Sequence, residues 1–384
     1  MTDIRHQPDD RLRLTRLARG HSQGDLARAA GVTRQAISGI ESGRWSPSLD
    51  VALALAKVLE STVEELFGVP ADAPPVRARL AIQTGRQPTN GAARRLALSE
   101  ISGSTVAYPL LGDSSFVPGF VPALGVARED LSPEPHSEGS VGHGIRRHRC
   151  ADVQALRTAQ AFPTLAIGGC DPALALLQGP LQRHDPEVGL VWWPCGNTVA
   201  LQLLESGVSH IASVHRSLDS RRKHWPGVEV VGFASWREGL AVSPRHSATV
   251  RGLEDIASRG LRIANREPGS EARRLLDERL ASGSIAPGTI AGYDTECTAH
   301  LLVASAIASG LVDAGVTTEP AALTYGLDFV PWQQEISELL IPRSLMGGVE
   351  VKAFLDVLAG RELRQQLGAL DGYNAESCGR ILAA

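Results

Sequence analysis

Cysteines, aromatic residues and long hydrophobic runs are all scarce in this sequence of 384 residues. The five cysteines are an odd number, are widely scattered and form no Cys-x-x-Cys pair, which favours reduced thiols in a cytoplasm over a zinc site. No stretch approaches the ~18 apolar residues that span a bilayer, and the first residues lack the apolar core of a secretory signal. We therefore expect a cytoplasmic protein without a membrane partner.

Motifs for catalysis and nucleotide binding are missing as well. No GxxxxGK[ST] or GxGxxG follows a predicted strand, and Ser270 stands in Gly-Ser-Glu instead of a Gly-x-Ser-x-Gly elbow. Acidic residues show no metal-ligand spacing, and the lone histidines His136 and His143 lie in a polar stretch where solvated side chains are expected. The sequence thus predicts no enzyme activity, no cofactor and no metal.

What the sequence does contain is a pair of short helices joined by a tight turn, within residues 23–43. Gly31 suits the turn because it lacks Cβ, and Thr33 can cap the second helix. Ile37 and Ile40 lie three apart on the buried side of that helix. The side chains predicted to be exposed there are Arg34, Gln35, Ser38 and Glu41. Arginine pairs with guanine and glutamine with adenine in the major groove, so the pattern indicates a DNA-binding helix-turn-helix.

Positive charge is concentrated around this motif. Seven arginines and two acidic residues lie between positions 11 and 44, whereas the whole chain has a formal net charge of −4. Affinity for phosphate must therefore come from this patch. Ser48 is predicted to cap a further helix whose core comprises Leu49, Leu53, Leu55, Val58 and Leu59.

Residues 12–67 resemble a Cro/repressor-type (XRE-type) helix-turn-helix domain. The resemblance implies a phosphate contact for Gln23 and a backbone-facing position for Arg44. It also implies contacts to bases or phosphates from Thr33, Arg34, Gln35 and Ser38. Gly39 departs from the pattern, because that position often carries a longer base-reading side chain. Two-fold operators are usual for such domains, so we expect a homodimer on double-stranded DNA. A helical bundle for protein contact is the alternative.

A second region begins with residues 69–75, which include three prolines and predict a hinge. Short β-like runs follow at 96–101, 105–111 and 116–121, and residues 129–144 form a polar surface loop. We therefore divide the chain into an all-α helix-turn-helix domain (1–68), a hinge with a small β-rich connector and polar loop (69–161), and a C-terminal domain (162–384). The connector is predicted to act as a spacer.

The C-terminal domain alternates strands with helices. Strands are predicted at 164–168, 188–193 and 210–215, with helices at 173–181 and 197–205 between them, which implies a parallel sheet. Residues 228–242 cross into a second set: strand 262–265, helices 271–280 and 298–309, and strand 314–316. A pair of strands (327–330 and 336–341) and closing helices (350–359 and 362–367) complete the domain. Two α/β lobes joined by crossing segments are the architecture of a periplasmic-binding-protein clamshell.

Residues 164–382 resemble the molybdate-binding-protein-like domain found fused to helix-turn-helix regulators. In its motif Asn-Arg-x-x-Gly-Ser-Gly-Thr-Arg, the residues Asn265, Arg266, Gly269, Ser270 and Arg273 match, while Glu271 and Ala272 replace Gly-Thr. The resemblance implies molybdate or a related oxyanion as ligand. A carboxylate at Glu271 beside a helix N-terminus opposes an anion, so either Glu271 turns outward or the ligand is not a simple oxyanion. A zwitterionic or cationic metabolite is the alternative.

Ligands of open α/β sheets sit beyond the carboxyl ends of the strands, where helices begin. This rule nominates the ligand-binding residues Gly169, Cys170, Asp171, Asn197, Thr198, His215, Arg266, Gly269, Ser270, Tyr293, Thr298 and Glu319. Asp171 is equally suited to capping the helix at Pro172, and His215 to a place in the core. The sequence predicts a transcriptional regulator that responds to a small-molecule effector. A regulator whose C-terminal domain is only an oligomerisation scaffold is the contrasting hypothesis.

Overall fold

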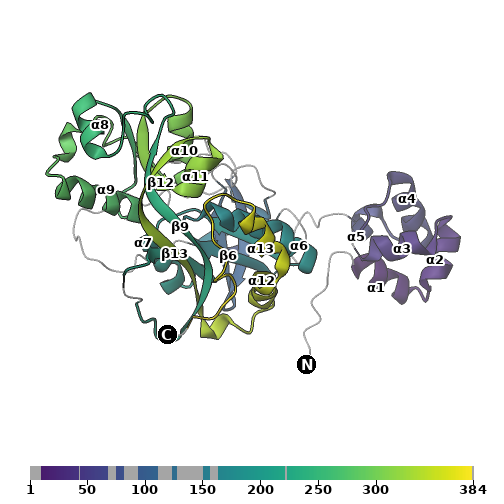
Figure 1. The fold of residues 1–384 in the computed structure, drawn as a ribbon. Helices are drawn as coiled ribbons and strands as arrows, with labels where there is room; N and C mark the ends of the chain where they lie inside the picture. Colours follow the sequence, from purple (N-terminus) through teal and green to yellow (C-terminus); the bar gives the residue numbers. More distant parts are fainter. Residues whose placement is uncertain are drawn as a thin grey trace, which may run out of the picture.

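The computed structural model describes residues 10–42, 44–67, 75–81, 94–110, 123–127, 150–155, 163–220 and 223–382. These residues form a helical bundle, a closed β-barrel and a two-lobed α/β body. Figure 1 shows the bundle and the body. The predicted multi-domain fold class is thereby confirmed. Within the described ranges, no helix has the length and hydropathy needed to cross a bilayer. The predicted run 116–121, the loop 129–144 and the histidines His136 and His143 lie outside the described residues.

The bundle confirms the predicted helix-turn-helix. Its helices are α1 (Asp10–Ala18), α2 (Gln23–Ala30), α3 (Arg34–Glu41), α4 (Leu49–Val58) and α5 (Val63–Phe67). Gly31 ends α2 with a φ of 72°, in the left-handed region that favours glycine. Thr33 caps α3 by accepting a hydrogen bond from the Ala36 N–H at 3.1 Å. Ser48 caps α4 in the same way.

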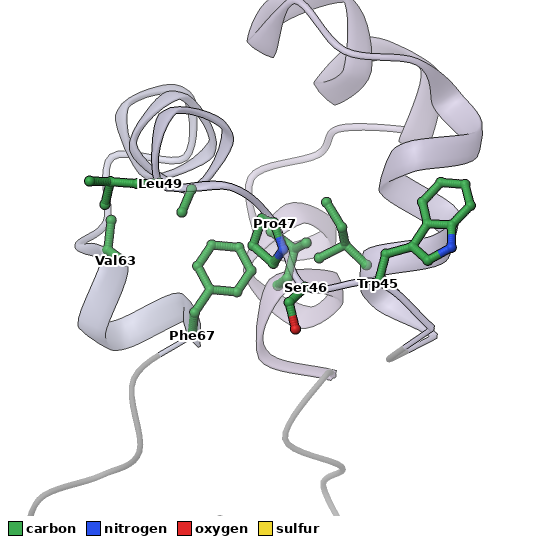
Figure 2. Close-up of a pocket in the computed structure, with 9 residues that line it drawn as sticks. Trp45, Ser46, Pro47, Leu49, Val63 and Phe67 are labelled. Atoms are coloured by element: carbon green, nitrogen blue, oxygen red, sulfur yellow. The ribbon is translucent and has the colours of Figure 1, made fainter. Parts of the chain in front are cut away.

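Helix α4 corrects one prediction about the core of the bundle. Leu55 and Leu59 are buried as expected, but Leu49 is 70% exposed and Leu53 is 53% exposed. The reason is that α4 packs the face bearing Ala52, Leu55 and Ala56 against the other helices. Leu49 instead lines an apolar groove of about 480 Å³, together with Trp45, Pro47, Val63 and Phe67 (Figure 2). The groove carries none of the charged side chains that a polar effector requires.

The connector is a closed barrel whose strand order is β1-β3-β2-β4-β5. Its strands are β1 (Val76–Leu80), β2 (Arg94–Ile101), β3 (Ser104–Pro109), β4 (Gly125–Ala127) and β5 (Cys150–Ala155). Strands β2 and β3 correspond to the predicted runs 96–101 and 105–111, and they form a hairpin through Ser102 and Gly103, both with positive φ. The β-rich character is confirmed, while β1, β4 and β5 were not predicted.

The barrel packs directly on the α/β body. Ile101, Val106 and Tyr108 share one hydrophobic cluster with Ala166, Leu203 and Val208 of the body. The Tyr108 hydroxyl donates a hydrogen bond to the Val208 carbonyl at 2.5 Å, and Ser99 donates one to the Thr164 carbonyl at 2.6 Å. The connector is therefore part of a common core and not merely a spacer.

The body consists of two lobes. Lobe I comprises β6 (Thr164–Gly168), a 3-10 turn (Pro172–Leu177), α6 (Gln178–His184), β7 (Gly189–Trp193), α7 (Asn197–Glu205), β8 (Ile211–Ser217), α12 (Val349–Ala359) and α13 (Arg361–Gly368). Lobe II comprises α8 (Leu253–Arg259), β10 (Ile263–Arg266), α9 (Glu271–Ser282), β11 (Glu296–Cys297), α10 (His300–Ala308), β12 (Ala314–Thr318) and α11 (Glu319–Thr324). Strands β6, β7 and β8 are parallel, as predicted.

Two long strands join the lobes, β9 (Val228–Val242) and β13 (Asp328–Pro342). They lie at the centre of one sheet ordered β11-β10-β12-β9-β13-β8-β6-β7 (Figure 1). The predicted crossing segment 228–242 is confirmed as β9. The predicted pair of strands at 327–330 and 336–341 is wrong, because β13 is continuous. Its pairing with β9 includes both predicted strands. The register shifts between Pro331 and Gln333 and between Ser337 and Glu338, but the strand does not end where the break was expected.

A second correction concerns the predicted helix 173–181. The structure divides it into the 3-10 turn ending at Leu177 and α6 starting at Gln178. Pro180 lies in the first turn of α6, where its missing N–H and fixed φ are tolerated, whereas a continuous helix would place it in the interior. The short helices α8 and α11 were not predicted.

Candidate functional site

The N-terminal half of α3 presents the predicted DNA-reading residues. Thr33, Arg34 and Gln35 are exposed and Ser38 is half-buried on the same helix. Arg44 is also exposed, and its Nε donates a hydrogen bond to Ser42 Oγ at 3.0 Å. A polar, exposed helix start of this kind can enter a major groove.

Glu41, predicted to be exposed, is instead buried and supports α3 from within. Its carboxylate accepts hydrogen bonds from Arg16 Nε at 2.6 Å and Nη2 at 3.1 Å. Gln23 Nε2 donates a third at 2.7 Å. The exposed-face assignment fails because α1 brings a buried guanidinium against this side of α3. Gln23, the predicted phosphate contact, is thus tied to the ion pair through its side-chain amide.

Gly39 has a packing reason for its lack of a side chain. A Cβ built there would lie 2.6 Å from Trp45 Cε3, which is much closer than carbon atoms approach in proteins. The ring of Trp45 therefore occupies the space that a longer base-reading side chain would need.

In the α/β body, two predicted turns meet across the lobes. Thr198, at the start of α7 in lobe I, donates a hydrogen bond to the Gly269 carbonyl of lobe II at 3.4 Å. Ser270 caps α9 by accepting from the Arg273 N–H. Asn197 turns inward, where its amide exchanges hydrogen bonds of 2.7 and 3.1 Å with the backbone of His215. The structure therefore brings the predicted residues of both lobes together in a closed arrangement.

Three other predicted residues are engaged elsewhere. The Tyr293 hydroxyl donates to Asp277 Oδ1 at 2.6 Å, and its ring packs under the Arg273 guanidinium at 4.2 Å. Glu319 is bound through both oxygens by Arg237. Thr298 is exposed, and its carbonyl accepts a 3.4 Å hydrogen bond from Arg266.

The most concentrated chemistry lies where the lobes meet. Cys170, His215 and His300 each offer one potential metal-ligand atom, and these atoms lie within 4.8 Å of one another. His215, Glu238 and Glu335 form a second group of the same size. Cys170 follows β6 and His215 lies on β8, so both belong to lobe I, whereas His300 begins α10 of lobe II. Glu238 and Glu335 lie on the long strands β9 and β13, and both are fully buried.

The imidazole of His215 is held by a carboxylate. Its Nδ1 lies 2.9 Å from Glu335 Oε2, while Glu335 Oε1 accepts from Gln333 Nε2 at 2.5 Å. Burial lowers the pKa of His215, but the charge of Cys170 and the hydrogen bonds to Cys170 and Glu335 outweigh it. The net effect raises the pKa well above its ordinary value.

Burial also shifts the neighbouring groups. It holds the pKa of His300 well below its ordinary value, with help from the positive charges of Arg266 and His215. It raises the pKa of Glu238, and it raises the pKa of Asp171 to about 6 although Tyr373 and Ala173 donate hydrogen bonds to that carboxylate. Asp171 thus both caps the turn at Pro172 and faces this central region. Both roles considered for it from sequence are compatible with its position.

Several buried side-chain atoms around this cluster lack a hydrogen-bond partner among the described residues. They are Asp171 Oδ2, Trp236 Nε1, both oxygens of Glu238, Arg266 Nη1, His300 Nε2 and Ser337 Oγ. Native proteins leave few buried polar groups unsatisfied, because each costs about 1–3 kcal/mol. Their gathering at one point is what a site for a polar ligand or ion requires. We call this set, with Cys170, His215 and Glu335, the central cluster.

Sequence reasoning found only part of the central cluster. It nominated Cys170, Asp171, His215 and Arg266, and it missed Trp236, Glu238, His300, Glu335 and Ser337. The available signal was an acidic residue within each strand that crosses between the lobes. Acidic residues are rarely fully buried without a partner, so nothing in the sequence indicated that Glu238 and Glu335 lie in the core.

Replacing Glu238 by glutamine is expected to raise the free energy of unfolding of the ligand-free protein by about 1–2 kcal/mol. The reason is that a neutral amide is easier to bury than a carboxylate that has no hydrogen-bond partner among the described residues. Urea denaturation at neutral pH measures the change. Glu362→Gln, at an exposed carboxylate paired with Arg183, is the control and should change stability little. A loss of stability in Glu238→Gln would show that the carboxylate is well accommodated.

Two family models match the chain. Residues 12–66 match a helix-turn-helix family, and residues 178–359 match a family described as PBP superfamily domain. The first covers α1 to α5, and the second covers most of both lobes, including β9 and β13.

Individual proteins match as well. The uncharacterized protein YvgK of Bacillus subtilis is 31% identical over 230 residues, which cover 57% of this chain and 74% of YvgK. An uncharacterized HTH-type transcriptional regulator of Archaeoglobus fulgidus is 39% identical over 57 residues, which cover 15% of this chain and 81% of that protein. Among solved structures, a putative phosphate ABC transporter substrate-binding protein with bound phosphate from Clostridium perfringens is 12% identical with a TM-score of 0.41. That match covers 55% of this chain and 99% of the transporter protein.

Proposed function

We propose that this chain, which belongs to the XRE-type helix-turn-helix regulators that carry a PBP superfamily domain, is a ligand-responsive transcriptional regulator and not an enzyme. Its bundle binds a double-stranded DNA operator in the cytoplasm as a homodimer, and its lobes close on a small effector. The observation that carries the sensing role is the central cluster, in which several buried polar atoms have no hydrogen-bond partner among the described residues.

The barrel provides the physical connection between the two activities. It follows the bundle in sequence and shares a hydrophobic cluster with lobe I. An effector that favours the closed lobes changes the position of lobe II relative to the barrel and lobe I. A coupling free energy of about 1–3 kcal/mol would change operator affinity roughly 5–150-fold.

The charges of the central cluster favour an effector with a positive group over molybdate. Asp171, Glu238 and Glu335 are buried carboxylates. Two nitrogens of the Arg266 guanidinium are already bound by Glu267 at 2.8 and 2.9 Å, and only Nη1 has no partner among the described residues. Glu271 turns outward to Arg274, so it is not what opposes an anion here. An oxyanion would meet three neighbouring carboxylates. The cationic or zwitterionic alternative is therefore the better supported one.

Thermal denaturation of the full-length chain tests the sensing role. A ligand that binds only the folded protein raises its melting temperature by mass action. We expect cationic or zwitterionic ligands to raise it and molybdate to leave it unchanged. If ligands of neither class do so, the lobes are only a scaffold. A molybdate-dependent rise that disappears in Arg266→Ala would instead support the oxyanion assignment.

Substituting Arg34 or Gln35 by alanine is expected to weaken binding to the specific operator by about 1–3 kcal/mol each, because each side chain can make a two-pronged contact with one base. Fluorescence anisotropy with the operator and with a scrambled duplex, at fixed salt, separates the loss of specificity from the loss of general affinity. Arg183→Ala, an exposed arginine of lobe I, serves as the control. If both variants still distinguish the operator from the scrambled duplex as well as the parent protein does, α3 does not recognise the bases.

A further inference from the structure

We propose that the effector is a divalent transition-metal ion, bound by Cys170 Sγ, His215 Nε2 and His300 Nε2 where the lobes meet. This inference rests on the proposed function, because it names the positively charged ligand that the central cluster takes. One potential ligand atom from each residue lies within 4.8 Å of the other two, and all three residues are buried. A space of this size suits one ion better than an organic molecule.

His300 is prepared for a metal by its hydrogen bonds. The Thr317 hydroxyl donates to the His300 carbonyl at 3.1 Å, so its oxygen is free to accept from His300 Nδ1 at 3.4 Å. With the proton on Nδ1, the lone pair lies on Nε2. Nε2 is buried and has no hydrogen-bond partner among the described residues. A neutral imidazole with an unused buried lone pair can bind a metal ion directly.

His215 has the support that metal-binding histidines usually have. Its Nδ1 faces Glu335 Oε2 at 2.9 Å, and metal binding displaces the proton that its other nitrogen shares with Cys170. Ligating histidines almost always donate their other N–H to a carboxylate or carbonyl, which fixes the ring and the tautomer. Glu335 is itself held by Gln333. Glu335 is therefore a positioning residue that acts through His215.

The donor set selects the class of metal. A thiolate with two imidazoles suits Zn²⁺ and related late transition metals and does not suit Mg²⁺ or Ca²⁺, which prefer oxygen. Zinc bonds of about 2.0–2.3 Å place tetrahedral ligand atoms roughly 3.5 Å apart, so the cluster needs only a modest contraction. Glu238, which belongs to the neighbouring group around His215, supplies negative charge that offsets the ion.

The same residues suggest one competing assignment. Cys170, His215 and Glu335 have the order of a nucleophile, a base and an orienting acid. That assignment gives no role to His300 Nε2 or to the Glu238 carboxylate, both buried and without a hydrogen-bond partner in the part of the chain that the structure describes. A metal site accounts for both, so we favour it.

The position of the ligands also supplies a mechanism for sensing. Cys170 and His215 belong to lobe I, whereas His300 belongs to lobe II. The ion completes its coordination only when the lobes are closed, so it binds the closed state more tightly than the open one. Differential affinity of this kind is what a ligand needs in order to shift a conformational equilibrium.

Cobalt binding to the full-length chain, stripped of metal with a chelator, tests the proposal. We expect one Co²⁺ per chain, with the near-ultraviolet charge-transfer band of a cobalt–thiolate bond. Cys170→Ser should lose that band, and His300→Gln should weaken binding by about 100-fold or more. Glu335→Gln should weaken it by about 10–100-fold without removing the band. Cys150→Ser in the barrel and His246→Gln in lobe II are the matched controls, and circular dichroism verifies that each variant is folded.

Three outcomes would overturn the metal assignment. These are no cobalt bound by the parent chain, a thiolate band that survives Cys170→Ser, or rapid alkylation of Cys170 in a chain that binds no metal. If an organic cation instead raises the melting temperature and changes operator affinity, only the metal assignment fails. If neither metal nor organic ligand has any effect, the sensing role fails with it.

Discussion

Replacing Tyr108 by alanine is expected to lower the free energy of unfolding by about 3–5 kcal/mol, the usual loss for truncating a buried aromatic side chain. Tyr108 is 2% exposed and lies between the barrel and lobe I. Its ring packs in the shared hydrophobic cluster, and its hydroxyl donates to the Val208 carbonyl. Because this contact also connects the barrel to the ligand-binding lobes, the variant should bind effector and DNA while responding less to the effector.

Urea denaturation and operator titrations with and without effector measure these two effects. Tyr108→Phe is the matched control, since it keeps the ring and removes one hydrogen bond, with an expected loss of about 1 kcal/mol. A Tyr108→Ala protein that keeps the full change in operator affinity would show that the signal does not pass through the barrel.

The second large effect is expected in the bundle, where Glu41→Gln should destabilise α3 by about 2–4 kcal/mol. Arg16 and Glu41 form an ion pair whose side chains are only 7% and 5% exposed. Removing the carboxylate charge leaves a buried guanidinium without compensation, and it weakens the hydrogen bond from Gln23. Hydrogen exchange of the α3 amides measures the loss of local stability, and operator binding should fall with it.

Glu60→Gln provides the comparison for that experiment. Glu60 pairs with Arg19 on the surface, where the side chains are 76% and 45% exposed. Exposed pairs contribute about 0–1 kcal/mol, so α3 should exchange at nearly its original rate. Equal effects of the two substitutions would contradict a special role for the buried pair.

The sequence predicted the elements that carry their own local signals. Residues 164–168 and 197–205 match β6 and α7 at both ends, and the predicted crossing segment 228–242 has the bounds of β9. A short apolar run bounded by glycine defines β6, and Gly196 precedes α7. The turn at Gly31 and the cap at Thr33 depend on a few neighbouring residues in the same way, so no knowledge of the rest of the fold was needed.

Features that depend on distant partners were harder to predict. Strand β13 is continuous because β9 pairs with it from Asp328 to Pro342. The register shifts between Pro331 and Gln333, close to where the sequence indicated a break. The barrel closes through pairing of β1 with β5, whose residues are far apart in the chain. Glu41 is buried only because α1 places Arg16 beside it.

The candidate ligand site shows the same difference between residues that a local rule selects and residues that depend on distant parts of the fold. The rule that ligands lie beyond strand ends selected Cys170 and His215, which the structure places in the central cluster. Glu238 and Glu335 lie within strands and not at their ends, so that rule passed over them. His300 lies at the start of a helix that was predicted to begin two residues earlier. The other nominated residues keep their proposed ligand roles as predictions.

The shared cluster between the barrel and lobe I also determines how the protein can be divided. Truncation just before β6 would strip Ile101, Val106 and Tyr108 from Ala166, Leu203 and Val208. The uncovered apolar surface would promote aggregation. The shortest fragment suited to studying the two lobes alone therefore starts with β1 at Val76.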